Sequence, residues 1–451
     1  MTSVLWFRRD LRLRDNPALH EAAGDGPVVA LFVLDPALLK PAGAPRIAFL
    51  YRSLRALDED LRSHGGRLIV RRGDPVNVVP KVVKEANASA VHVTGDFGPY
   101  GSKRDEAVEK ALGDDVRFVR TGSPYAVTPG QLAKKDGEVY KVYTPYYRAW
   151  KDRGWHSPAT TISGRVDWHT DVRSDDIPKD PELPATLELP DAGEDAARKT
   201  WKKYHDNALK NYGDERDRPD LDSTSHMSMY LKWGAIHPRT ILADLGPGDD
   251  TYRGEIAWRD FYATILATWP ESAREYFNPE LAGMDYARAD TKAFEAWTKG
   301  ETGFPIVDAG MRQLLAVGWI HNRVRMIVAS FLVKDLHIEW QHGARHFMKH
   351  LVDGDLASNQ HGWQWVAGSG TDAAPYFRIF NPITQGQKFD PNGDYVRRWI
   401  PELREVEGKQ AHTPWELDAP PPKYPEPIVD HKKERQVALD RYQAARAHSS
   451  S

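Results

Sequence analysis

Cysteine is absent from all 451 positions of the sequence. This absence excludes disulfide bonds, iron–sulfur clusters, zinc sites built on thiolates and a cysteine nucleophile. Any redox chemistry must therefore come from a bound cofactor or from aromatic side chains.

Targeting and membrane-spanning segments are lacking as well. The opening residues, MTSVLWFRRD, do not have the basic-then-apolar run of a signal peptide, and no long uncharged apolar stretch follows. Charged residues make up 28% of the chain and hydrophobic residues 41%, as is normal for a globular protein in water. We expect a cytoplasmic protein without a membrane partner, and the length predicts two or three domains.

Sequence signatures of hydrolytic and metal chemistry are also missing. The chain has no G-x-S-x-G elbow, no Walker loop and no H-E-x-x-H motif. His342, His346 and His350 recur every fourth residue, which can place imidazoles on one helical face. No further ligand is spaced to complete a catalytic zinc motif, so we expect no metal site. The formal net charge of -3 does not suggest a nucleic-acid-binding protein, although net charge can hide a local basic patch.

The first 120 residues alternate between strand-like apolar runs and helix-like segments. The apolar runs are SVLWF, PVVALFVLD, RLIVRR, AVHVTGD and VRFVR. This alternation predicts a doubly wound, five-stranded parallel sheet in an α/β domain over residues 1–130. Such sheets bind ligands beyond the carboxyl ends of their strands. The first strand leads into FRRDLRLRDNP instead of a glycine-rich turn, which disfavours a nicotinamide-dependent dehydrogenase.

The pattern changes twice in the rest of the chain. Residues 131–195 are rich in Pro, Asp, Ser and Thr toward their end, which predicts an interdomain linker. Residues 196–451 show helical periodicity with few breakers, as in EIAWRDFYATILATW, which predicts an all-α domain.

A row of hydroxyl side chains precedes one apolar helix, at Ser223, Thr224, Ser225 and Ser228. We expect one of them to be the N-cap of that helix. Several together could also cradle a phosphate at the helix N-terminus, but the interpretation as a cap alone is favoured.

Polar residues interrupt other helical segments. Glu255 and Arg259 are spaced as an i,i+4 pair, which is most often a surface salt bridge. Alternatively, the carboxylate binds a polar heterocycle on which Trp258 stacks. The stretch DGDLASNQHGWQW, residues 353–365, combines acids, amides and two tryptophans, which suggests a planar and partly polar ligand. An aromatic-rich helical domain without thiols is typical of a protein whose cofactor performs the chemistry.

Several sequence blocks, in order along the chain, match one family. They are LWFRRDLRLRDNPAL, TSHMS, EIAWRDFY, TGFPIVDAGMRQL, GWIHNRVRM, DGDLASNQHGWQW and GTDAAPYFRIFNPITQGQKFD. The chain resembles the photolyase/cryptochrome family, particularly the bacterial class I cyclobutane pyrimidine dimer (deoxyribodipyrimidine) photolyases. The resemblance implies an antenna-binding α/β domain and a helical FAD-binding catalytic domain. It also implies light-driven repair of cyclobutane pyrimidine dimers in DNA, by electron transfer from reduced FAD to a flipped-out dimer.

The resemblance leaves alternatives within and beyond this activity. A cryptochrome-type blue-light photoreceptor is one, but GWQW retains the tryptophan that stacks on the dimer. Repair of the 6-4 photoproduct is another, but HNRVRM is similar to the cyclobutane type. A light-independent flavin-binding or single-strand DNA-binding module is a third. We expect a monomer with no obligate protein partner.

The resemblance assigns roles to residues of this sequence. The FAD-binding residues are expected to be Tyr212, Thr224, Ser225, His226, Met227, Ser228, Tyr252, Arg325, Asp353, Gly354, Asp355 and Asn359. The residues expected to act on the dimer are Glu255, Trp258, Asn322, Met326, Asn359 and Trp365. The residues expected to contact DNA are Arg216, Glu255, Trp258, Arg259, Tyr262, Asn322, Arg323 and Gln385. Asn359 should face the central ring nitrogen of the flavin, where an amide does not readily supply a proton.

The resemblance also implies a chain of aromatic residues that reduces the flavin in light. Trp363 and Trp340 match its first two members. The third tryptophan of the family is missing, because Ala287 stands at its position. The nearest aromatic residue is Tyr286, and we predict that it is the terminal electron donor.

A second chromophore, the antenna, is expected in the N-terminal domain. The loop GDFGPYGSKRD is similar to the loop of relatives that bind 8-hydroxy-5-deazaflavin, and it lacks the Asn-Glu pair of relatives that bind methenyltetrahydrofolate. Arg46 and Asp96 match positions that contact deazaflavin. We therefore predict a deazaflavin antenna, with the folate as the alternative.

Overall fold

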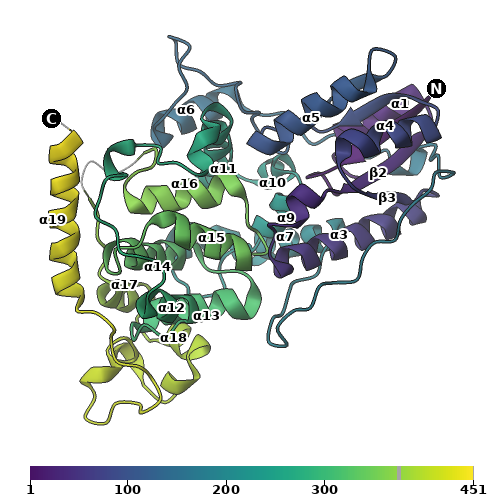
Figure 1. Ribbon diagram of the computed structural model, residues 1–451. Helices are drawn as coiled ribbons and strands as arrows, with labels where there is room; N and C mark the ends of the chain where they lie inside the picture. The colour runs from purple at the N-terminus through teal and green to yellow at the C-terminus, as the bar shows by residue number, and fades with distance from the viewer. Residues whose placement is uncertain (373–376, 450–451) are drawn as a thin grey trace. The chain divides into compact units, whose positions relative to one another are not determined.

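The computed structural model describes residues 1–372 and 377–449 (Figure 1). The chain divides into two compact units. The first unit comprises Met1–Leu183, Leu189–Lys210 and Ser225–Pro270. The second comprises Pro184–Glu188, Asn211–Thr224 and Glu271–Ser451. Residues 373–376, which belong to the block GTDAAPYFRIFNPITQGQKFD, lie outside the described residues.

The first unit is built on a parallel sheet of five strands in the order β3-β2-β1-β4-β5. The strands are β1 (Thr2–Phe7), β2 (Val28–Leu34), β3 (Leu68–Arg72), β4 (Ala88–Val93) and β5 (Arg117–Arg120). The helices between them are α1 (Pro17–Asp25), α2 (Pro36–Leu39), α3 (Ala44–Ser63), α4 (Pro75–Glu85) and α5 (Pro99–Leu112). Three of these helices start with proline directly after a capping side chain, Asn16 for α1, Asp35 for α2 and Asp74 for α4. Proline suits this position because the N–H that it lacks would have no helical partner.

Both faces of the sheet are covered, so its strands are apolar on both sides. Side chains of α1 and α3 pack on one face against residues such as Leu5, Phe7 and Phe32. Side chains of α4 and α5 pack on the other face, against Val4 and Val91 among others. This is the predicted doubly wound α/β arrangement, and that prediction is confirmed.

The remaining helices of the first unit are α6 (Tyr143–Arg153), α7 (Glu194–Asn207), α9 (Ser228–Trp233), α10 (Pro238–Asp244) and α11 (Asp250–Thr268). Of these, α6 packs along α11. Asp260 of α11 holds this arrangement, because its fully buried Oδ2 accepts hydrogen bonds from the backbone N–H of Val127 and from Nε1 of Trp150.

The second unit is helical. Its helices are α8 (Tyr212–Glu215), α12 (Lys292–Lys299), α13 (Pro305–Val317), α14 (Asn322–Lys334), α15 (Trp340–His350), α16 (Leu356–Ala367), α17 (Pro382–Phe389), α18 (Asp394–Trp399) and α19 (His431–Ser449). The core forms where α13, α14, α15 and α16 pack together. Among the described residues, no helix has the length and apolar character needed to cross a membrane.

Candidate functional site

The carboxyl ends of strands β1, β2 and β4 carry a buried cluster of charges. Arg8, after β1, donates to Asp105 of α5 at 2.7 Å. Asp35, after β2, accepts a hydrogen bond from the Tyr100 hydroxyl at 2.5 Å. Trp6 lies under two guanidinium groups, those of Arg8 and Arg104, 4.7 and 5.0 Å from its ring centre. The cluster therefore occupies the edge at which doubly wound sheets bind ligands.

Arg46 and Asp96, the two residues predicted to contact an antenna, lie in the first unit. Arg46 is buried in the first turn of α3. Asp96 follows β4, and its carboxylate accepts from the Gly98 backbone N–H and from Arg104. Burial alone would raise the pKa of Asp96, but the nearby arginines hold it below the usual value. Asp96 is therefore an ionised anchor for its own loop.

The hydroxyl row before α9 does not cap that helix, so the prediction of a hydroxyl N-cap is wrong. The N-cap is Met227, whose side chain makes no capping bond. The hydroxyls have other partners: Ser225 Oγ accepts from the Tyr252 hydroxyl at 2.8 Å, and Ser223 lies 3.4 Å from the Glu215 carbonyl. His226 has a left-handed backbone, with φ of 51°, which turns the chain immediately before the helix.

Helix α11 carries the residues of the first unit that were predicted to contact the dimer or DNA, which are Glu255, Trp258, Arg259 and Tyr262. Trp258 is half-buried, and the ring of Tyr143 from α6 stacks on it with 3.6 Å between centroids and 7° between planes. The Tyr143 hydroxyl donates to the Gly254 carbonyl at 2.6 Å, which fixes the ring in this position. Tyr262 packs against the same indole at 5.3 Å. Sequence reasoning missed Tyr143, because no motif distinguishes it from the neighbouring tyrosines.

Arg259, on the same helix, is engaged inside the first unit. Its guanidinium donates to the carbonyls of Pro124 and Leu231 and lies 4.6 Å from the ring centre of Tyr125. Glu255 is half-buried one turn earlier. The guanidinium of Arg259 therefore ties the helix to its neighbours.

In the second unit, the acids and the amide of the DGDLASN stretch lie around the start of α16. Arg325 of α14 donates to Asp353 at 2.8 Å, while the other carboxylate oxygen of Asp353 is buried and has no partner among the described residues. Asp355 is the N-cap of α16 and accepts from the Ser358 N–H. The Asn359 amide nitrogen donates to the Ala344 carbonyl and to Gln360 Oε1, which leaves Oδ1 as the acceptor that it can offer to a ligand.

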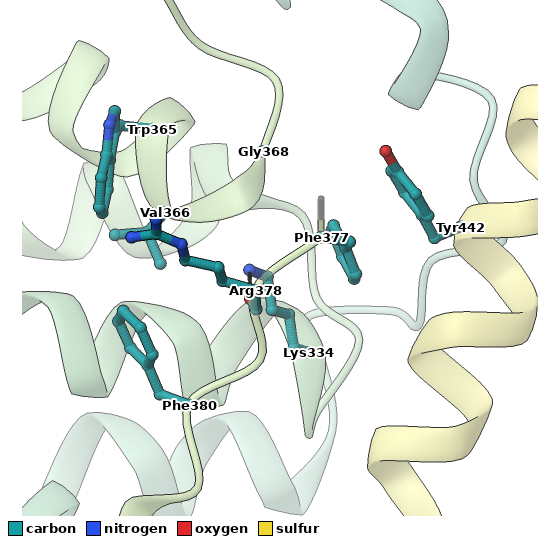
Figure 2. A pocket seen from close by; sticks show the side chains of 8 residues that line it. All are labelled: Lys334, Trp365, Val366, Gly368, Phe377, Arg378, Phe380 and Tyr442. Atoms are coloured by element: carbon teal, nitrogen blue, oxygen red, sulfur yellow. Dashed lines mark hydrogen bonds between the residues drawn. The ribbon is translucent and has the colours of Figure 1, made fainter. Parts of the chain in front are cut away.

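The two tryptophans at the other end of α16 have different surroundings. Trp363 is buried and packs so closely on α15 that a Cβ on Gly343 would lie 2.1 Å from its ring. Trp365 is half-buried and lines a hollow (Figure 2). The other lining residues are Lys334, Val366, Gly368, Phe377, Arg378, Phe380 and Tyr442. Figure 2 shows the Arg378 side chain reaching toward Trp365, while Lys334 donates to the Arg378 carbonyl.

An aromatic path continues from Trp340, the first residue of α15. Gly343, on which Trp363 packs, lies one helical turn after Trp340. The ring of Tyr276 is 6.1 Å from Trp340, and the ring of Tyr286 is 6.4 Å from Tyr276. Tyr276 therefore lies between the predicted second and third members of the electron chain. Tyr276 was not among the predicted residues, because the segment REYFNP carries no motif.

The predicted DNA contacts of the second unit differ in their exposure and in the groups that surround them. Asn322 is exposed at the first position of α14. Arg323 forms two bonds to Asp217, at 3.1 and 2.8 Å, and covers the ring of Phe389. Arg216 lies over the ring of Tyr212, and Gln385 has a buried Oε1 without a partner among the described residues. Met326 packs against the core edge.

The predicted site residues thus fall into two groups. The first unit holds Arg46, Asp96, Ser225, His226, Met227, Ser228, Tyr252, Glu255, Trp258, Arg259 and Tyr262. The second holds Tyr212, Arg216, Thr224, Tyr286, Asn322, Arg323, Arg325, Met326, Trp340, Asp353, Gly354, Asp355, Asn359, Trp363, Trp365 and Gln385.

Comparison with known proteins shows to which family the chain belongs. Residues 3–163 match the family model of DNA photolyase, and residues 252–444 match that of the FAD binding domain of DNA photolyase. A deoxyribodipyrimidine photo-lyase of Streptomyces griseus is 41% identical, and the match covers 95% of this chain and 96% of that protein. The chain belongs to the DNA photolyase family.

Solved structures of photolyases share the fold. The crystal structure of a class III photolyase from Agrobacterium tumefaciens superposes with a TM-score of 0.90 at 37% identity, covering 99% of this chain and 98% of that one. An archaeal photolyase from Sulfolobus tokodaii gives 0.87 at 31% identity, covering 98% and 100%. The predicted family and the α/β-plus-helical fold are confirmed. The class within the family and the roles of individual residues stay predictions.

Proposed function

We propose that this photolyase repairs cyclobutane pyrimidine dimers in DNA in a light-dependent reaction. The observation that carries the proposal is near full-length similarity to proteins named deoxyribodipyrimidine photo-lyase, from Streptomyces griseus among others. Bound FAD, in its reduced form, supplies the photoexcited electron that splits the cyclobutane ring. The protein binds the flavin, positions the dimer and excludes water.

The acceptors around the start of α16 fit a flavin dinucleotide. The buried, unpartnered oxygen of Asp353 needs a donor, because an unsatisfied buried carboxylate oxygen is costly, and FAD carries several hydroxyl groups. Arg325 keeps the other oxygen in place. Asn359 offers Oδ1 as a neutral acceptor for a ring N–H of the reduced flavin. In the first unit, the Tyr252 hydroxyl donates to Ser225 Oγ, and we propose FAD binding for this pair as well.

Trp258 and Trp365 are the proposed stacking surfaces for the dimer. Each indole is half-buried. Stacking on an aromatic side chain contributes about 1–3 kcal/mol per base. A dimer is already poorly stacked in the duplex, so flipping it out costs less than flipping a normal base. Glu255 would bond the edge of a pyrimidine, and Met326 would pack beneath.

Phosphate contacts provide affinity without sequence preference, which suits a lesion that occurs anywhere in the genome. Arg216, Asn322 and Gln385 are the proposed contacts, since a guanidinium group and side-chain amide N–H groups can donate to phosphate oxygens and Asn322 is exposed. Arg259 and Arg323 already bond within the protein, so for these two we propose support of the DNA-binding face. We further propose a cytoplasmic monomer.

For the antenna we propose a flavin-like chromophore, 8-hydroxy-5-deazaflavin, at the carboxyl ends of β1, β2 and β4. The Sulfolobus tokodaii photolyase holds two FAD molecules, one of which is implicated in light harvesting, so flavin-type antennas occur in this fold. Arg46, Asp96 and the half-exposed Tyr100 would contact it. Extraction of holoprotein from the native host should give a deazaflavin absorption band. A folate band alone would overturn this choice.

A repair assay tests the main proposal. Irradiated oligonucleotides that carry either cyclobutane dimers or 6-4 photoproducts are incubated with reduced holoprotein, in blue light and in darkness. We expect loss of cyclobutane dimers in light only. Loss of 6-4 products would indicate a 6-4 photolyase, and no repair of either lesion would indicate a photoreceptor. Trp365→Ala should weaken binding to dimer-containing DNA more than to undamaged DNA.

A further inference from the structure

Tyr276 is packed between two apolar clusters of the second unit. One is the main helical core, which contains Trp340, and the other is a small cluster around Leu281, Met284 and Tyr286. Tyr276 packs against both. Its ring meets Trp340 edge-on, at 83° between planes, and lies 6.4 Å from Tyr286. Aromatic contact thus runs from Trp340 through Tyr276 to Tyr286.

Backbone hydrogen bonds of the residues that follow Tyr276 and Tyr286 fix the positions of these two tyrosines. The N–H of Phe277 donates to Gln364 Oε1 at 2.7 Å, and the N–H of Asn278 donates to the Ser369 carbonyl at 2.8 Å. The N–H of Ala287 donates to the His337 carbonyl at 2.7 Å, next to the start of α15. These bonds tie both segments to the helices that carry Trp363 and Trp340.

The groups along this path differ in their ability to release a proton. Trp340 is buried, and its indole N–H has no partner among the described residues. Tyr286 donates its hydroxyl to the Leu281 carbonyl, which is a weak base. Tyr276 donates to a carboxylate, that of Glu339, at 3.0 Å. Burial, together with Tyr286 and Glu339, raises the pKa of Tyr276, so it is a phenol in the resting protein.

We propose that Tyr276, with Glu339 as its proton acceptor, is the residue that reduces oxidised Trp340 during photoreduction of the flavin. The inference rests on the proposed function, since bound flavin, once photoexcited, would supply the oxidant for Trp363 and Trp340. In the step, Tyr276 gives one electron to the Trp340 radical cation and its phenolic proton to the Glu339 carboxylate. The products are neutral Trp340, a neutral tyrosyl radical and a neutral Glu339 acid, so charge balances. Tyr286 then gives one electron and its phenolic proton to the Tyr276 radical, which restores the Tyr276 phenol and leaves a neutral Tyr286 radical.

Four variants of the FAD-loaded protein test this assignment: Tyr276→Phe, Glu339→Gln, Tyr286→Phe and Tyr442→Phe. The last is a matched control, because Tyr442 belongs to the same small cluster but stacks on Phe377. Illumination of oxidised holoprotein is followed by flavin absorption and by electron paramagnetic resonance of the tyrosyl radical. We expect Tyr276→Phe to slow photoreduction several-fold and to abolish the early radical. Glu339→Gln should remove the solvent deuterium isotope effect on radical formation. Tyr286→Phe should keep the early radical, and Tyr442→Phe should behave like the parent.

Other outcomes overturn the inference. Parental photoreduction and radical formation in Tyr276→Phe would exclude Tyr276 as the donor. Equal losses of bound FAD and melting temperature in Tyr276→Phe and Tyr442→Phe, with no change in the radical signal, would assign a structural role instead. Chemically reduced Tyr276→Phe should still repair dimers at the parental rate, because repair does not use this path. If the reduced parent repairs no dimer, the proposed function fails, while the radical measurements still decide the role of Tyr276.

Discussion

At the scale of single residues, Asn359 shows how a side-chain amide is oriented before any ligand binds. Its amide nitrogen has two acceptors, the Ala344 carbonyl at 3.2 Å and Gln360 Oε1 at 2.8 Å. The assignment of nitrogen and oxygen follows from these two acceptors, because the reverse orientation would place oxygen against oxygen. The protein thus presents an acceptor and no proton to the proposed flavin.

Asn359→Asp should destabilise the protein in a pH-dependent way. A carboxylate cannot donate, so two buried acceptors lose their donor, at a cost of about 1–3 kcal/mol. Burial also raises the pKa of such a carboxyl group, so the loss should be larger at pH 8 than at pH 5, where the protonated acid regains one donor. Thermal unfolding at both pH values measures this. Asn359→Ala removes the donors without adding a charge, so its loss should not change with pH; the same pH response in both variants would refute the argument.

At the scale of helices, the packing of α6 against α11 holds in place the indole of Trp258, which is proposed to stack on the dimer. Tyr143 covers one face of Trp258, and its hydroxyl bond to the Gly254 carbonyl keeps it there. A tryptophan held in one rotamer loses less entropy on stacking with a base. Tyr143 is thus a positioning residue for Trp258.

Tyr143→Ala should weaken binding of dimer-containing DNA by about the value of one aromatic pair, 0.5–1.5 kcal/mol. Tyr143→Phe keeps the stacked ring and should bind nearly as well as the parent. Titration of a labelled oligonucleotide gives the dissociation constants. Tyr147→Ala is the control, because Tyr147 stacks on Tyr143 from the same helix and bonds the Asp250 carbonyl. Equal weakening by both alanine variants would mean that α6 as a whole has shifted and that the pairing with Trp258 is not specific.

The sheet could be predicted from the sequence, whereas the bonding partners of the amides in helix α16 could not. The alternation of strands and helices predicted the sheet, because both faces of each strand are covered by apolar helices. The cluster of amides in DGDLASNQHGWQW suggested a polar ligand, but two of them serve the protein itself. Gln360 donates to the Ala273 carbonyl, and Gln364 bonds both the Ser272 carbonyl and the Phe277 N–H. Long-range bonds of this kind depend on which segments meet in space, so a local pattern does not reveal them.

For the whole molecule, the buried acid Asp260 makes the stability of the first unit depend on pH. The side chain is fully buried, and burial raises its pKa to about 6, from an ordinary value of 3.8. Two donors, Val127 N–H and Trp150 Nε1, bond its Oδ2, while Oδ1 has no hydrogen-bond partner among the described residues. Ionisation therefore costs more in the folded protein than in the unfolded chain.

The free energy of unfolding is therefore expected to fall as the pH rises through the pKa of Asp260. Because the folded pKa is raised, the contribution of Asp260 is fully present below pH 3.8 and disappears as the pH rises through about 6. A shift of about two units corresponds to a loss on the order of 3 kcal/mol. Asp260→Asn keeps an oxygen for both donors and carries no charge, so its stability relative to the parent should rise between pH 4 and pH 7. Urea unfolding across this range gives the difference in free energy of unfolding between the variant and the parent. The titration of all other groups cancels in this difference.

Asp290→Asn is the control, because Asp290 forms an exposed ion pair with Arg288 and has a lowered pKa. Its difference in free energy of unfolding from the parent should stay flat over the same pH range. A flat difference for Asp260→Asn as well would show that the Asp260 carboxyl is ionised throughout, held in that state by Arg259 at 3.9 Å.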